Sequence, residues 1–569
     1  MTSNSLSRRA FLASAVSASV AGCNGVQYRD RYEPGERVSL TVSAPPADDD
    51  EAATTIARTL TDRLSSLGVD AVFEPKGRSQ LYLDALINHD FDVFVGRYPN
   101  LTHPDALYPL LHSSFAPEPG WQNPFGVTSV AIDDALEALR ESADSTGALR
   151  EFLDVYVERV PFSVVTAPDF LTVRREELAV PDGATTEQPL DLLAQLASTS
   201  LDRAFRAGIF SVEITENRNP LAGEFRWNNQ LLGLVYDSLA RPSRNGPGFI
   251  PWAARDWYFE DGDLVVELRP GQTFHDGSQL TAQDVAFTLR LLSDTSLGEA
   301  PSPVPATRFR GHTTLVSDAE ATDERTVRFE VADHVDPVNA ERVLRVPILP
   351  EAEWADRTEL VEERVTKALV WENRQPVGSG PLAFEEATPE ESVRFRPYES
   401  HFLGDTNDDR LTKYAPALDA AGVVARYAPS GEDALVALGD GRLDTSLDLF
   451  PLQAIGGVED ANDVVSASSP SDELCIVGYN FRRAPLSDFR FRQVLARLHD
   501  REHTAASVFD GFARATDLPM VEDWHEVDWS SEFTVGSFPG SDGELDVSTA
   551  RDRFEEAGYT YDDDGNLFR

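Results

Sequence analysis

The sequence of 569 residues contains only two cysteines, Cys23 and Cys475. Because Cys23 lies at the end of a segment typical of a leader, no disulfide is expected within the mature chain. A chain of this length does not need one, since it is long enough to form two or three packed domains. Cys475 lies in the apolar run Leu474–Val477 and is expected to be a small buried hydrophobic residue.

Lysine is nearly absent, because only Lys76, Lys367 and Lys413 occur among 50 basic residues. The acidic residues number 96, and the net charge of −46 is spread along the chain, which excludes nucleic acid as a partner. A surface of short carboxylates stays hydrated in molar salt, where screening cuts the range of charge repulsion to about 3 Å. The composition therefore predicts a halophilic host. The acidic runs Asp48–Glu51 and Asp562–Asp564 are expected to be solvated surface rather than calcium sites.

Signatures of catalysis are also missing. The sequence contains no Gly-x-Ser-x-Gly, no His-Glu-x-x-His and no phosphate-binding loop. His499 and His503 have the spacing of two metal ligands on a helix, but no third ligand is near them, and the charged residues between them favour an exposed face. His275 lies in a turn after Phe274, where a structural role is favoured. We expect no catalytic residue, no metal and no cofactor.

The first 23 residues are typical of a processing signal. Ser7–Leu12, with its arginine pair, resembles the twin-arginine export motif, and Val20–Cys23 resembles a lipobox. The apolar stretch between them is too short to span a bilayer. These features predict cleavage before Cys23, lipidation of its thiol and an anchor on the outer face of the membrane, followed by a tether over residues 24–37. No later apolar run is long enough for a membrane helix.

Apolar periodicity predicts an α/β organisation. In the first part of the chain, strands are expected at residues 38–42, 69–73, 92–95 and 162–165, with helices at 56–67, 81–87 and 135–157. Residues 180–190 have the composition of a linker. The second part is expected to contain strands at 209–214, 264–268, 446–450 and 476–481, and helices at 190–198, 228–239, 282–292, 432–438, 489–498 and 550–557. Thr281 is expected to cap the helix at 282–292.

The segment Leu268–Phe287, with the turns Arg-Pro-Gly and His-Asp-Gly, is very similar to the signature of the extracellular solute-binding proteins of ABC transporters, family 5, which serve peptides, dipeptides and nickel. Five further segments resemble the same family in its own order: Leu231–Leu239, Pro376–Pro381, Gly439–Asp444, Asn480–Val494 and Ala550–Tyr559. Residues 38–178 resemble what this family normally carries after the last of these segments. The chain is therefore expected to be circularly permuted, a change that proteins tolerate where old and new termini lie at the surface.

The resemblance implies an α/β, two-lobed fold like that of the periplasmic binding proteins of type II, cluster C, with an extra subdomain in the first lobe. After the signal and tether, the expected divisions are 38–158 (second lobe, first part), 159–206 (return to the first lobe and permutation linker), 207–240 (first lobe), 241–375 (extra subdomain), 376–478 (first lobe) and 479–569 (second lobe, second part). The strands that cross between lobes are expected near 163–167 and 477–481.

The same resemblance implies capture of oligopeptides or dipeptides by lobe closure and delivery to ABC permease subunits, by a monomer with no enzyme activity. In this family an aspartate of the second lobe often pairs with the peptide's amino terminus; Asn100 stands at that position, and Asp105 is a possible substitute. The full set of expected ligand-binding residues is Tyr98, Asn100, Asp105, Asn217, Trp227, Phe450 and Asn480. Oligosaccharides and nickel chelates remain alternative solutes, and a secreted hydrolase is the alternative from another class.

Overall fold

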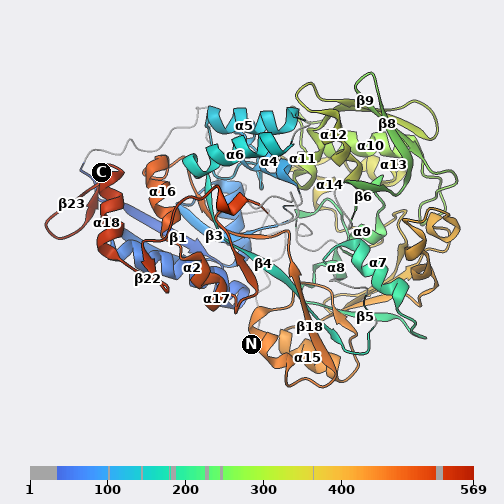
Figure 1. The fold of residues 1–569 in the computed structure, drawn as a ribbon. Coiled ribbons are helices and arrows are strands. Elements are labelled where there is room, and N and C mark those ends of the chain that lie inside the picture. The colour runs from blue at the N-terminus through green and yellow to red at the C-terminus, as the bar shows by residue number, and fades with distance from the viewer. Residues whose placement is uncertain are drawn as a thin grey trace. The chain divides into compact units, whose positions relative to one another are not determined.

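The computed structural model describes residues 35–569 except 100, 102, 143–144, 179, 181–186, 224–229, 244–247, 363 and 521–528. The chain forms two compact units: unit 1 contains residues up to Asp169 and from Pro470 onward, and unit 2 contains Phe170–Ser469. Figure 1 shows the consequence, since the earliest and latest elements, blue and red, belong to the same unit. The chain passes between the units at 169–170 and at 469–470, whereas the crossings were expected near 163–167 and 477–481.

Unit 1 is built on a mixed sheet in the order β4-β19-β3-β1-β2. β1 pairs in parallel with both β2 and β3, and β19 runs antiparallel to β3 and β4. The alternating apolar residues of β1 and the fully buried β19 account for this central position. The strand bounds are β1 Ser39–Ala44, β2 Asp70–Pro75, β3 Val93–Tyr98, β4 Phe162–Arg175, β19 Leu474–Tyr479 and β20 Ala513–Ala515.

The helices of unit 1 bury apolar faces with helical spacing. In α2 these residues include Ile56, Leu60 and Leu64, all at most 4% exposed. The longer helices are α2 Ala47–Ser66, α5 Val130–Glu141, α6 Ser145–Arg159, α16 Phe489–Arg497, α17 Arg501–Ser507 and α18 Val547–Glu556. The predicted helix at 81–87 is divided between α3 (Arg78–Tyr82) and a π-helical segment, Leu83–Asn88.

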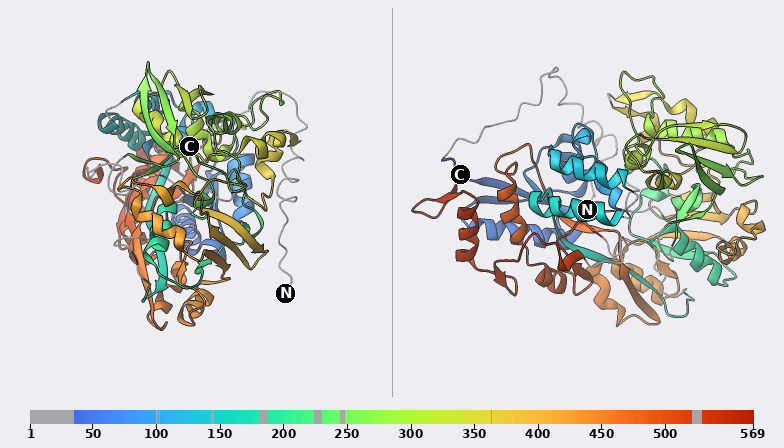
Figure 2. Two further views of the ribbon diagram at one scale, coloured as in Figure 1. Left: turned by 90° about the vertical axis from the view of Figure 1, so that its right-hand side faces the viewer. Right: turned by 45° about the horizontal axis from the view of Figure 1, so that its top comes forward.

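The first and last described segments of unit 1 lie side by side. The Val38 N–H donates to the Leu567 carbonyl at 2.9 Å, and the Leu567 N–H donates to the Gly68 carbonyl at 2.9 Å. Gly68 has a φ of +83°, and a Cβ there would collide with the Gly565 carbonyl oxygen, so the position requires glycine. Figure 2 shows the C-terminal end of the chain beside the start of β1. The permuted order requires these neighbours, and the permutation itself stays a prediction.

Unit 2 contains a second sheet portion in the order β14-β15-β16-β5-β17-β4. β5 lies in parallel between β16 and β17, while β14 and β15 form an antiparallel hairpin. The bounds are β5 Phe205–Ile209, β14 Leu382–Thr388, β15 Ser392–Pro397, β16 Val423–Tyr427, β17 Thr445–Ser446 and β18 Val464–Pro470. Helices α7 (Pro189–Ser198) and α15 (Gly431–Gly439) match the sequence-based prediction, and leucines 190, 192, 193 and 196 of α7 join the core of this unit.

Unit 2 also contains a four-stranded antiparallel sheet with its own core. Its order is β10-β11-β9-β8, with β8 Ala254–Glu260, β9 Asp263–Leu268, β10 Val316–Ala321 and β11 Thr326–Val331. Helix α10 (Ala282–Ser293) packs its buried face on this sheet. Thr281 caps the helix as predicted, in a reciprocal capping box with Asp284. The short helices of unit 2 include α8 Glu213–Glu216, α9 Leu232–Val235, α11 Arg310–Thr313, α12 Pro337–Ala340, α13 Glu351–Trp354 and α14 Lys367–Val370. Unit 1 contains the short helix α4 Leu107–Leu111.

The strand predicted at 209–214 is wrong. β5 ends at Ile209, begins four residues before it at Phe205, and is followed by the short helix α8. Its buried residues are Phe205, Ala207 and Ile209, but the arginines around it hid the pattern. Asp444 holds this segment in place. Its carboxylate accepts two 2.7 Å hydrogen bonds from the Arg203 side chain and one of 2.8 Å from the main-chain N–H of Arg206.

Two further elements are shorter than predicted. Residues 228 and 229 of the helix expected over 228–239 lie outside the described residues, and the described part, 230–239, contains only the short helix α9. It ends early because main-chain groups after Tyr236 bond to other segments: the Asp237 carbonyl accepts the Ile348 N–H at 2.8 Å. The strand expected over 446–450 ends at Ser446, and the chain then turns so that the Phe450 N–H donates to Leu171. Within the described residues, no helix is long and apolar enough to cross a membrane.

Candidate functional site

Each unit ends its parallel strands at a common edge. In open α/β sheets, ligands bind outside the carboxyl ends of the parallel strands, because loops and backbone groups converge there. In unit 2 this edge lies after Ile209 of β5 and Ser446 of β17. In unit 1 it lies after Ala44 of β1 and Tyr98 of β3. Each edge is a candidate site of its own, and each is described within its own unit.

The edge of unit 2 is closed by a contact between the two segments that follow the strands. The Phe210 N–H donates to Oδ2 of Asp448 at 2.8 Å. The rings of Phe210 and Phe450 meet edge to face, 5.8 Å apart. Phe450 is 1% exposed, so in this structure it packs the edge. Beside this contact lies a small cavity lined by Ile209, Ser211, Ile214, Gln230, Leu231, Leu447 and Asp448.

The edge of unit 1 is held by aromatic and charged contacts. Tyr98 is 1% exposed, its ring lies 5.2 Å from that of Trp121, and its hydroxyl donates to the Ala106 carbonyl at 3.3 Å. Asp105 accepts two hydrogen bonds from Arg140, at 2.5 and 3.1 Å. The Arg140 guanidinium also lies 3.6 Å from the centre of the Tyr108 ring. The carboxylate that could substitute for an amino-terminal clamp is thus engaged by a buried arginine.

A second ion-pair group lies at the same edge of unit 1. Arg97 of β3 donates to Asp50 at 2.6 Å and to Glu473 at 2.7 Å. Burial works against the charge of Arg97, but the two carboxylates outweigh it and hold its pKa above the ordinary value. Cys475, one strand away on β19, is fully buried, and burial raises the pKa of its thiol to about 12. The thiol therefore stays protonated and unreactive, which confirms its expected role as a buried hydrophobic residue.

Of the remaining expected ligand-binding residues, the structure describes Asn480 and Asn217. Asn480 follows β19 at the opposite end of β3 from Tyr98, where its side chain donates to the carbonyls of His89 and Phe91 at 3.0 and 2.8 Å. Asn217 is 1% exposed and accepts the Asn219 N–H at 3.0 Å. Asn100, Trp227 and Cys23 lie outside the described residues.

Sequence reasoning did not select Ser211, Gln230 and Asp448. Ser211 and Asp448 each lie two residues beyond the end of a parallel strand. A polar residue at that position is a recognisable signal once the strands are correctly placed. The wrong bounds of the strand at 209–214 concealed it, because Ser211 was assigned to the middle of that strand. Gln230 had no such signal, since only the fold brings it to the cavity.

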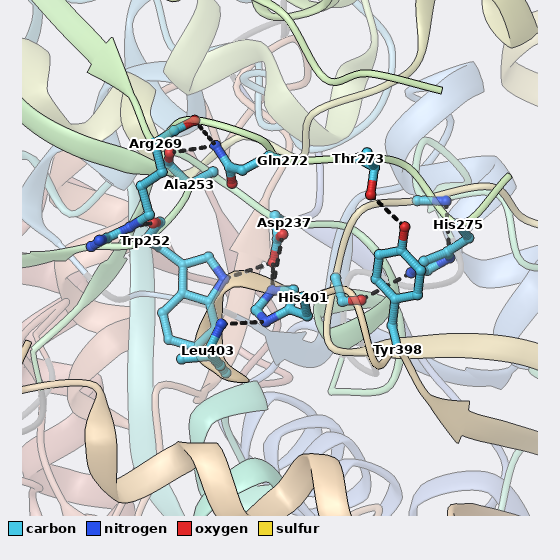
Figure 3. Close-up of polar contacts among 12 residues, drawn as sticks. Asp237, Trp252, Ala253, Arg269, Gln272, Thr273, His275, Tyr398, His401 and Leu403 are labelled. Atoms are coloured by element: carbon cyan, nitrogen blue, oxygen red, sulfur yellow. Dashed lines mark hydrogen bonds and ion pairs between the residues drawn. The ribbon is translucent and has the colours of Figure 1, made fainter. Parts of the chain in front are cut away.

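Three of the family-like motifs meet in the interior of unit 2. The Gly380 N–H donates to the Val235 carbonyl at 2.9 Å, and a Cβ at Gly378 or Gly380 would collide with the carbonyl oxygens of Val235 or Leu234. His275 joins them, because its Nε2 donates to the Gly380 carbonyl at 2.9 Å and its Nδ1 accepts the Gly378 N–H at 3.3 Å. Figure 3 shows this junction together with Tyr398 and Thr273. The close packing of the three segments accounts for the residue types of the motifs at this point.

A buried charge network lies next to this junction (Figure 3). Asp237 accepts the Trp252 indole N–H at 2.6 Å and lies 3.3 Å from Nε2 of His401. Burial alone would raise the pKa of Asp237, but His401, Arg241 and Trp252 outweigh it and lower the pKa. His401 borders a polar groove of about 490 Å³ with Arg269, Gln272 and Phe402. Both ring nitrogens of His401 are engaged, since Nδ1 accepts the Leu403 N–H, so the network is a scaffold.

His275 makes stability depend on pH. Burial lowers the pKa of its imidazole from 6.5 to about 4, so the unfolded chain takes up this proton more readily than the folded one. The associated stability is complete above pH 6.5 and is lost as the pH falls toward 4. The free energy of unfolding of the wild type should therefore fall between pH 7.5 and pH 5 by about 2 kcal/mol more than that of H275Q. Denaturant titration at both pH values measures this. A pH slope in H275Q equal to that of the wild type would contradict the prediction.

His499 and His503 differ in burial, since the first side chain is buried and the second is exposed. His499 is 4% exposed, so the expectation of an exposed face is wrong for it, while His503 lies at the surface. Burial lowers the pKa of His499 well below the ordinary value, which keeps it neutral. No group of three or more metal-ligating side chains occurs in the part of the chain that the structure describes.

This chain is similar to known proteins over part of its length. Residues 248–568 match the model of the bacterial extracellular solute-binding proteins, family 5. Heme-binding protein A of Haemophilus influenzae is 22% identical over 337 residues, 57% of this chain and 56% of that protein. Probable di/tripeptide-binding protein 5 of Pseudomonas aeruginosa is 26% identical over 278 residues, 47% of this chain and 49% of that protein. The chain thus spans about half the length of the curated relatives it matches.

Among solved structures, the oligopeptide-binding protein AppA from Bacillus subtilis in complex with a nonapeptide is 17% identical, with a TM-score of 0.45. The match covers 64% of this chain and 66% of that chain. The family match includes parts of both units, since it runs from unit 2 into the C-terminal part of unit 1. Residues 38–178 lie outside it, so the permuted order gains no support from this match.

Proposed function

The chain belongs to family 5 of the bacterial extracellular solute-binding proteins, and from this premise we propose that it captures a peptide outside the cytoplasm and delivers it to an ABC permease. The family match, over residues 248–568, carries the proposal. Two curated relatives support the peptide class by name, since one is a probable di/tripeptide-binding protein and another an oligopeptide-binding protein. A relative named as a heme-binding protein shows that the solute itself varies among similar chains.

The architecture supports binding rather than turnover. Each unit offers the carboxyl edge of parallel strands, where main-chain and polar groups are available to a solute. The engaged state of Asp105 and Cys475 leaves neither as a nucleophile or a base. We propose that the solute binds at the carboxyl edges of these parallel strands. The ligand-binding roles expected of Tyr98, Asn100, Asp105, Asn217, Trp227, Phe450 and Asn480 stay predictions.

Capture that engages both units should make the protein more compact without consuming the peptide. Small-angle scattering of the chain with and without saturating tri- to pentapeptides should show a smaller radius of gyration in the bound state. Mass spectrometry of the same mixture should return the peptides intact. Progressive hydrolysis by the pure protein would move it to the class of secreted hydrolases, and binding of an oligosaccharide or a nickel chelate in place of peptides would change the solute.

We further propose that the chain is anchored to the outer face of the membrane through Cys23, as the twin-arginine and lipobox resemblances suggest. Two acyl chains on one cysteine hold a protein at a membrane stably, whereas one chain binds only weakly and reversibly. The intact mass of the membrane-bound form should therefore show cleavage before Cys23 and added acyl groups. C23A should appear in the soluble fraction, and equal membrane retention of C23A would refute the anchor. The halophilic host stays a prediction from composition.

A further inference from the structure

One face of the sheet in unit 2 is apolar, and the other carries arginines. The apolar face packs into the core of the unit with Phe205, Ala207, Ile209, Val393, Phe395, Val423 and Ala425. Because side chains alternate along a strand, the residues between these point away from that core. They include Arg206 on β5, Arg394 on β15 and Arg426 on β16. These strands therefore present guanidinium groups on one face, in a chain whose net charge is −46.

Arg206 lies at the centre of a group of like charges. Burial, and then the charges of nearby arginines, lower the pKa of Arg206, although the carboxylate of Asp444 opposes them. The arginines that act on it come from the end of β4, from the residues before β5 and from β16. Together with Arg206 they form what we call the arginine cluster, which consists of Arg175, Arg203, Arg206 and Arg426.

Two guanidinium groups of the arginine cluster have free donors. Asp444 is occupied by Arg203, which donates two hydrogen bonds of 2.7 Å to it, and its Oδ2 lies 4.0 Å from Nε of Arg206, too far for a hydrogen bond. Among the residues that the structure describes, the guanidinium groups of Arg206 and Arg426 donate no hydrogen bond, and Nε of Arg206 is buried without a partner. Each guanidinium carries five N–H donors, so the cluster has unused capacity for an anion.

The geometry of these donors selects the kind of partner. A guanidinium presents its N–H groups in a planar fork that matches a carboxylate or a phosphate. Small solutes bind in concave sites, and neither of the two cavities described above includes a residue of the arginine cluster. A macromolecule with exposed anionic groups therefore fits this face better than a small anion.

Acidic residues at the border favour a protein loop over a bilayer. Glu177, which lies 2.7 Å from Arg175, has a side chain that is 73% exposed. The Asp440 side chain is 63% exposed, and the next residue, Gly441, lies against the Arg175 guanidinium. A flat anionic bilayer would bring its phosphates against these carboxylates, whereas a loop can place a few carboxylates on the arginines alone. In the molar salt predicted from the composition, screening limits charge attraction to about 3 Å, so only such direct contacts contribute.

We infer that the arginine cluster docks an acidic segment of a partner protein, whose side-chain carboxylates accept hydrogen bonds from Arg206 and Arg426. The inference goes beyond the proposed function, because it adds a protein contact to unit 2 and uses no residue described at the candidate solute-binding edges.

Fluorescence anisotropy of dye-labelled hexaglutamate and hexaglutamine, both blocked at their ends, tests the inference on the full chain at about 1 M salt. The wild type should bind hexaglutamate about tenfold more tightly than hexaglutamine, since each exposed ion pair contributes up to about fivefold. R426M should weaken hexaglutamate binding about three- to fivefold, and R206M/R426M should abolish the preference. R206K/R426K keeps the charges without the forks and should lie between these limits. R255M removes the same charge from β8, where the side chain is 57% exposed and pairs with Glu267, and should keep the preference.

Equal affinity for both peptides, or an undiminished preference in R426M and R206M/R426M, would overturn the inference. Arg426 is exposed and its guanidinium donates no hydrogen bond to a described residue, so R426M keeps the test valid if R206M disturbs the fold. Loss of hexaglutamate binding in saturating tri-alanine would place that peptide in the solute site and overturn the inference as well. Binding to phosphatidylglycerol vesicles without a preference for hexaglutamate, or a dimer that dissociates in R426M, would assign the cluster to a bilayer or to a second copy instead. Peptide capture by R206M/R426M, followed by scattering, tests the proposed function separately.

Discussion

D105A should lower the free energy of unfolding by about 3–5 kcal/mol, because it leaves the charge of Arg140 buried without its carboxylate. The Arg140 side chain is 1% exposed and that of Asp105 8%, so water replaces little of the lost interaction. The two hydrogen bonds of this pair join α5 to the segment that follows β3, at the candidate edge of unit 1. Denaturant titration followed by intrinsic fluorescence measures the change, since Trp121 lies in the same region.

Two further variants separate the ion pair from general damage. D134A removes an exposed carboxylate from the same helix and should change the free energy of unfolding by no more than about 0.5 kcal/mol. The double variant D105L/R140M replaces the buried pair by apolar side chains and should recover most of the loss, because the uncompensated charge disappears with it. A loss below about 1 kcal/mol in D105A would show that the pair does not hold this edge.

R492M should destabilise unit 1 by a similar amount, about 3–5 kcal/mol, because it removes the donors of three main-chain carbonyls at once. Arg492 donates to Val160 at 2.9 Å, to Leu486 at 2.6 Å and to Arg159 at 2.7 Å. Val160 has a φ of +44°, an unfavourable conformation for a β-branched residue, and Arg492 helps to hold it. Burial lowers the pKa of Arg492 to about 9, so the guanidinium is still charged at neutral pH.

A conservative variant makes the test specific for the forked geometry. R492K retains the charge but cannot reach three carbonyls with one ammonium group, so its stability should lie between those of the wild type and R492M. R490M alters an exposed arginine of the same helix and should be nearly neutral in thermal and chemical unfolding. Wild-type stability in R492K would refute the role of the three-way contact.

Local patterns predicted much of the fold, because they report on neighbours along the chain. Apolar spacing located α10, α16 and α18 within a few residues but missed the first nine residues of α2. The Thr281 cap was predicted from a side chain that bonds its own helix. The errors arose where distant segments decide. The strand around Ile209 was misplaced because Asp444, far along the chain, pairs with the Arg203 side chain before the strand and accepts the main-chain N–H of Arg206 within it.

The sequence by itself determined the family, the α/β class and the character of the surface, since these depend on motifs, periodicity and composition. Only the tertiary structure decided what individual polar residues do. Asp105 is paired with Arg140, and the Asn480 side chain donates a hydrogen bond to the His89 carbonyl, although both had the residue type expected of a ligand contact. Gln230 reaches a cavity with Asp448, which is 218 positions further along the chain. Hydrogen-bond partners and burial arise when the chain folds back on itself, and no local pattern contains them.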